Sequence, residues 1–149
     1  MLSNSGKILR AAFLATIIAM PSSAFATLLI TAEEAALPVQ KGAVPNWGRG
    51  ITRGPKIVVS DDGVQPSPIH FQVKFQALGG STIDLDGLKV TYLKTPNIDL
   101  TPRVKPFARA TGIDMPDALL PPGEHLVRID VKDSEGRVST TSFLLRIAP

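Results

Sequence analysis

The sequence predicts an all-β fold, a single antiparallel β-sandwich. Residues 69–78 give the clearest signal, because Phe71, Val73 and Phe75 alternate with polar residues. This is the pattern of a strand with one buried and one solvated face. Other short segments alternate in the same way, and turn sequences such as 133–136 (Asp-Ser-Glu-Gly) separate them. Many short strands with turn signals between them are typical of a sandwich.

Residues 1–26 have the pattern of a secretory leader. Lys7 and Arg10 form a basic start, an uncharged apolar run follows at 11–20, and 24–26 (Ala-Phe-Ala) matches the small-residue site that signal peptidases cut. A run of about ten residues is too short to span a bilayer, which takes about 20. We therefore expect a cleaved leader, a periplasmic or secreted protein, and no membrane span in the mature chain.

Composition limits what the mature chain can do. Residues 27–149 make one domain's length. Without Lys7 and Arg10 the chain has 14 basic and 13 acidic residues, so it has no electrostatic reason to bind nucleic acid. The absence of cysteine excludes disulfides, thiol catalysis and cysteine-ligated zinc.

We divide the mature chain into an irregular N-terminal arm, 27–54, and a β domain, 55–149. In the arm, Thr31 and Glu34 have the spacing of a capping box, which predicts a single helical turn that ends before Pro38. The stretch after it is rich in proline and glycine, so we expect no regular structure there.

The arm also holds the candidate partner-binding residues, Trp47, Arg49 and Arg53. Tryptophan and arginine are the residues that most often dominate interface energy. The alternative is a structural tether in which Trp47 packs back onto the sandwich.

The β domain is expected to contain several strands and one short helix. A helix over 103–108, with Thr101 as its N-cap and Pro102 at the first position, fits the preferences of those residues. We expect 95–120 as a whole to form a long loop, and long loops tend to be functional. The strands are expected at 56–60, 69–78, 88–92, 127–131 and 138–147.

Two segments resemble bacterial immunoglobulin-like (Ig-like) and fibronectin-III-like domains. Residues 120–125 (Leu-Pro-Pro-Gly-Glu-His), with the alternating strand and the Asp-Ser-Glu-Gly turn that follow them up to Phe143, resemble the closing hairpin of those domains. Residues 83–90 resemble a strand from their middle. The resemblance implies an Ig-like sandwich in an exported protein, with His125 as a corner residue packed on the preceding turn.

The same hairpin is similar to the end of small periplasmic copper-resistance binding proteins. That resemblance implies copper ligation by histidines at the mature N-terminus and after the Asp-Gly turn. Those positions hold Thr27 and Arg137 here, so the resemblance implies the fold without its ligands.

Metal binding by other residues is an alternative function. His70, His125 and Met115 could bind copper, and aspartates near turns, such as Asp84 and Asp86, could bind calcium. Aspartate is common in turns for conformational reasons alone, and we predict no cofactor.

We find no enzyme motif: the sequence has no Gly-x-Ser-x-Gly, no His-Glu-x-x-His and no phosphate loop. We expect a non-catalytic accessory protein of the bacterial envelope that binds another envelope protein. Its edge strands could accept another chain's backbone, or the arm and the 95–120 segment could bind. A glycan-binding module that uses Trp47 and Tyr92 is the remaining alternative.

Overall fold

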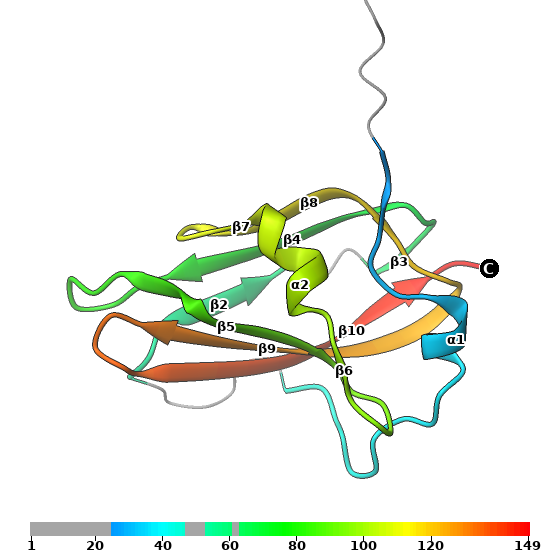
Figure 1. Cartoon of the computed structure of the whole chain (residues 1–149), viewed down its shortest axis with the longest axis horizontal. Helices are drawn as coiled ribbons and strands as arrows, with labels where there is room; N and C mark the ends of the chain where they lie inside the picture. Colours follow the sequence, from blue (N-terminus) through cyan, green and yellow to red (C-terminus); the bar gives the residue numbers. More distant parts are fainter. Residues whose placement is uncertain (1–24, 47–52, 61–62) are drawn as a thin grey trace, which may run out of the picture.

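A computed structural model describes residues 25–46, 53–60 and 63–149 of the chain. In these residues two β-sheets pack face to face (Figure 1). This arrangement confirms the predicted all-β sandwich. In the described part of the chain, no helix has both the length and the apolar character needed to cross a membrane.

Each sheet has five described strands, with the long strands inside and short ones at the edges. The described pairings are antiparallel, except that β1 runs parallel to β8 and β3 parallel to β10. The first sheet has the order β1 (Thr27–Leu28), β8 (Gly112–Leu119), β4 (Ile69–Gln76), β2 (Lys56–Val59), with β7 (Ala108–Arg109) also paired to β8. The second sheet has the order β3 (Val64–Gln65), β10 (Val138–Ile147), β9 (Gly123–Asp133), β5 (Ile83–Tyr92), β6 (Ile98–Asp99).

Alternation along the strands builds a shared core between the sheets. On β4 every second residue from Ile69 to Phe75 is buried, as the sequence predicts. The rings of Phe71, from the first sheet, and Phe143, from the second, stack with their centroids 6.0 Å apart. Burying a side chain of this size stabilises a fold by about 1.5–3 kcal/mol, so the core holds the two sheets together.

The prediction that residues 95–120 form a long loop is wrong. The segment contains two short helices, α2 (Thr101–Val104) and η1 (Lys105–Phe107), and the two strands β7 and β8. Strand β8 was not predicted because it contains Pro116, and a proline removes a hydrogen bond from the ladder of a sheet. The pairing of β8 with β4 shifts register between Met115 and Ala118, and Pro116 lies in this irregularity, where proline is tolerated.

The short helix is present, but its predicted N-cap is wrong. Leu100 is the N-cap of α2, and no side chain caps the helix. The Thr101 hydroxyl instead accepts a hydrogen bond from the backbone N–H of Val90 at 2.9 Å. The Asp99 carboxylate accepts one from the Thr101 N–H at 3.0 Å. Thr101 therefore ties the helix to β5.

The described part of the arm lies against the sandwich and enters its core. Strand β1 pairs with the end of β8, and Leu29 and Ile30 after it are fully buried. A helical turn, α1 (Ala32–Ala35), follows, and its predicted capping box is confirmed. Thr31 and Glu34 each accept a hydrogen bond from the other's backbone N–H. Two isolated bridges join the arm to the rest of the chain: Val39 with Lys94, and Asn46 with Ser142.

Candidate functional site

The candidate partner-binding residues of the arm are only partly described. Trp47 and Arg49 lie outside the described residues. Arg53 is described and exposed. The binding role of these three residues stays a prediction.

The residues proposed as metal ligands do not come together. His70 is exposed on β4 of the first sheet, whereas His125 is buried on β9 of the second. Asp84 and Asp86 lie on β5, where the Asp84 carboxylate accepts a hydrogen bond from the Asp86 N–H at 3.0 Å. Met115 lies on β8 and is fully buried in the core. Over residues 25–46, 53–60 and 63–149, no group of three or more His, Cys, Asp or Glu residues could hold a metal ion.

His125 lies near the start of β9, at the corner that follows the turn at 121–123, as the resemblance implies. Its Nε2 donates to the Pro121 carbonyl at 2.7 Å, and its Nδ1 accepts from the Tyr92 hydroxyl at 2.9 Å. Desolvation lowers the pKa of His125, and the positive charge of Lys94 lowers it further, while the bond to Pro121 acts in the opposite direction. The neutral imidazole thus has both nitrogens engaged in bonds that fix the corner.

Tyr92 and Lys94 extend this buried polar group toward the arm. Burial raises the pKa of Tyr92 to about 12. The Lys94 ammonium lies 5.1 Å from the centre of the Tyr92 ring and donates to the carbonyls of Ala35 and Leu37, each at 2.9 Å. Desolvation lowers the pKa of Lys94. The lysine therefore joins the end of β5 to the helical turn of the arm.

An ion pair gives the arm a second anchor. The Arg103 guanidinium donates to both carboxylate oxygens of Glu34, at 2.8 and 2.6 Å, and to the Leu29 carbonyl at 2.9 Å. The bond from Arg103 lowers the pKa of Glu34, and the same bond raises that of Arg103. Bidentate pairs of this kind fix geometry as well as charge, so they hold α1 against α2.

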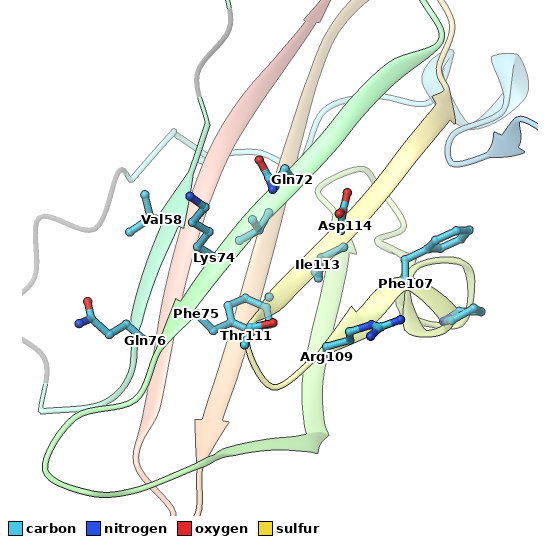
Figure 2. Close-up of a pocket in the computed structure, with 13 residues that line it drawn as sticks. Val58, Gln72, Lys74, Phe75, Gln76, Phe107, Arg109, Thr111, Ile113 and Asp114 are labelled. Carbon is cyan, nitrogen blue, oxygen red and sulfur yellow. The ribbon is translucent and has the colours of Figure 1, made fainter.

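The first sheet carries an open groove of about 670 Å³ on its outer face (Figure 2). Strands β2, β4, β7 and β8 and the helix η1 contribute to it. Its lining mixes charged, amide, aromatic and aliphatic groups, among them Val58, Lys74, Gln76, Phe107, Arg109 and Asp114. A surface site with this size and this mixture can hold a small molecule or a short segment of a partner.

Strand pairing places two cations on either side of a glycine in this groove. Gly112 of β8 lies opposite Lys74 of β4 and, on its other side, opposite Arg109 of β7. Neighbouring strands are about 4.8 Å apart, so the Cα atoms of the two cations are about 10 Å apart. Gly112 has φ +148°, and a Cβ there would come within 2.0 Å of the Val73 carbonyl oxygen. The floor between the cations therefore carries no side chain.

The carboxylate at the next position along the groove, Asp114, already has a side-chain partner. Gln72 lies opposite Asp114, and the Asp114 carboxylate is within hydrogen-bond distance of the His70 Nε2. No ion pair joins Asp114 to Lys74 or Arg109. Within the described residues, the cations of the groove have no ion-pair partner.

The described sheet edges are poorly suited to accept a strand from another chain. Strands β1, β3, β6 and β7 have two residues each and β2 has four. The outer edge of β5 is longer, but the register of β5 against β9 shifts between Asp84 and Lys89. Short, bulged and charged edges discourage strand addition, so the groove is the better candidate for a binding site.

Sequence reasoning missed the groove for an identifiable reason. Its residues come from two separate segments, 58–76 and 106–114, which only the pairing of β4 with β8 brings together. The alternation of Ile113 and Met115 with Asp114 is the signal that could have revealed β8.

Comparisons of this chain with protein-family models, with curated proteins and with solved structures give no match.

Proposed function

We propose that this chain is a small, exported, non-catalytic binding protein of the bacterial envelope. In this proposal an Ig-like sandwich holds a segment of another envelope protein in the groove of its first sheet. The observation that carries the proposal is the groove: about 670 Å³ of open space on a sheet face, lined by charged and apolar groups together. Binding sites commonly combine an apolar surface with a few polar groups that fix orientation.

Strand order supports the Ig-like part of the proposal. Constant-type Ig domains place strands A, B, E and D in one sheet and C, F and G in the other. Here β2, β4, β8 and β7 have the first order, and β5, β9 and β10 have the second. His125 also bonds back to the backbone at the start of β9, where a tyrosine does so in many such domains.

The described residues near the expected cleavage site are compatible with export. Strand β1 begins at Thr27, immediately after the Ala-Phe-Ala sequence. Phe25 is 88% exposed and Ala26 is also exposed. Cleavage after Ala26 would therefore remove neither a buried Phe25 nor a buried Ala26 from the fold.

Site-specific photo-cross-linking in the natural host tests the binding site. A photoreactive phenylalanine analogue would replace Gln76, which is exposed on β4 and lines the groove. A matched control would carry it at Lys89, which is exposed on β5 of the other sheet. We expect one dominant cross-linked envelope protein from position 76 and none from position 89. Cross-links from position 89 alone, or none from either position, would contradict the proposed site.

The same samples test export. We expect the intact mass of the protein in the envelope fraction to correspond to a chain that starts at Thr27. A chain that keeps residues 1–26, or that stays with the cytosolic fraction, would contradict that part of the proposal.

A further inference from the structure

We infer that the groove recognises an acidic peptide segment, with a carboxylate of the partner held over Gly112 between Lys74 and Arg109. This inference rests on the proposed function and adds the chemistry of the partner.

The register of three strands carries the first part of the argument. Lys74, Gly112 and Arg109 lie side by side on β4, β8 and β7, and both cations are exposed at the groove (Figure 2). Their Cα atoms are about 10 Å apart, and both side chains are long and flexible. In Figure 2 the two side chains point away from each other, Lys74 toward Val58 and Arg109 toward Phe107. With a change of rotamer in each, the two cationic groups can reach one anionic group from opposite sides, above a floor that has no side chain.

Charge gives the second part. Among the described residues, neither Lys74 nor Arg109 takes part in an ion pair. Asp114, on the wall of the groove, is paired with His70. A carboxylate between two unpaired cations gains charge-assisted hydrogen bonds, and with arginine these can be bidentate. The groove is thus complementary to negative charge.

The walls favour a peptide over a sugar. Phe107 is half-buried at one side of the groove, and Val58, which is 43% exposed, lies at the other. These apolar groups can contact the aliphatic parts of a peptide beside its acidic residue. The lining contains no Trp or Tyr among the described residues, and such rings are the usual stacking surfaces for sugars.

Titration of isotope-labelled mature protein tests the inference by NMR. The probe is a nine-residue peptide in which three glutamates alternate with serine and glycine, and the control peptide has glutamine in place of glutamate. We expect the glutamate peptide to shift the backbone signals of Thr111 and Gly112 at low ionic strength, and the shifts to decrease with added salt. The glutamine peptide should leave these signals unchanged.

Charge-removal variants locate the recognition. Lys74→Gln and Arg109→Gln should each weaken binding of the glutamate peptide about three- to tenfold, and the double variant should weaken it further. Lys89→Gln removes an exposed lysine from the other sheet and should change the affinity less than twofold. An unchanged thermal midpoint in each variant verifies the fold.

Three results would overturn the inference: no shift with the glutamate peptide, equal binding of the glutamine peptide, or tighter binding of a sulfated heparin oligosaccharide. The cross-link from position 76 keeps these results separate from the proposed function. If the Lys74→Gln/Arg109→Gln double variant still yields that cross-link at full strength, the groove binds a partner but not through an acidic segment. If the protein with the photoreactive residue at position 76 and with Lys74 and Arg109 intact yields no cross-link, the proposed function itself fails.

Discussion

His125 shows at the scale of single residues how burial decides the behaviour of a side chain. In the sequence, His125 follows the turn at 121–123, and the resemblance to Ig-like domains implies a corner role for it. The bonds to Pro121 and Tyr92 show why that corner needs a neutral ring, since Nδ1 must accept while Nε2 donates.

The lowered pKa of His125 makes stability depend on pH. The unfolded chain binds a proton at this residue near its ordinary value of 6.5, whereas the native chain does so only at lower pH. The contribution of neutral His125 to the free energy of unfolding is therefore fully present above about pH 6.5, and it is lost as the pH falls toward the native pKa. We expect urea denaturation to show a lower free energy of unfolding at pH 5.5 than at pH 7.5.

The variant His125→Gln isolates this effect, because glutamine can both donate and accept but does not titrate. We expect it to be less stable at pH 7.5, by about 1–3 kcal/mol for imperfect bonds to buried partners. Its unfolding free energy should change less between the two pH values than that of the unaltered protein. An equal pH dependence in both proteins would show that another group is responsible.

Gly112 is the second residue whose environment sets a sharp expectation. Gly112→Ala would place a Cβ within 2.0 Å of a backbone carbonyl at positive φ, so we expect a loss of more than about 2 kcal/mol. Gly80 also has positive φ, +76°, but open space around it, so Gly80→Ala should cost only about 1 kcal/mol. Thermal and urea denaturation of both variants measure the difference, and equal losses would contradict the close approach at Gly112.

At the scale of elements, polar contacts help to hold the arm against the sandwich. Glu34→Gln removes the charge that pairs with Arg103, and we expect a loss of about 1–2 kcal/mol. Hydrogen exchange should increase in β1 and α1 before it increases in β9 or β10. Glu33→Gln alters an exposed neighbour and should leave exchange unchanged, and a similar response in both variants would argue against the anchor.

The elements also show what a sequence can and cannot predict. Strands β4, β9 and β10 could be predicted because each has a long alternating pattern, and α1 because Thr31 and Glu34 form a local motif. Strand β8 could not be predicted, because Pro116 interrupts its alternating pattern. A proline is tolerated there only because the pairing of β8 with β4 is irregular at that point. The groove could not be predicted either, since Lys74 and Arg109 are neighbours only through the register of β8.

At the scale of the whole molecule, the arm and the sandwich share one core. Leu29 is fully buried there, whereas the adjacent Leu28 is 49% exposed. We expect Leu29→Ala to lower the free energy of unfolding by about 2–5 kcal/mol, with a single cooperative transition in urea. Leu28→Ala should cost less than about 1 kcal/mol. A small effect from Leu29→Ala, or a separate early transition, would mean that the arm unfolds independently.

The parallel pairing of β1 with β8 has a consequence for the order of events during the proposed export. Thr27 is paired with Ala118, about 90 residues farther along the chain, and closing so long a loop comes late in folding. A chain that emerges N-terminus first therefore lacks the partner of its first strand until most of it has crossed the membrane. Throughout that time the bond between Ala26 and Thr27 stays in an unpaired segment, accessible to the peptidase, and the mature amino terminus is incorporated into the sheet only afterwards.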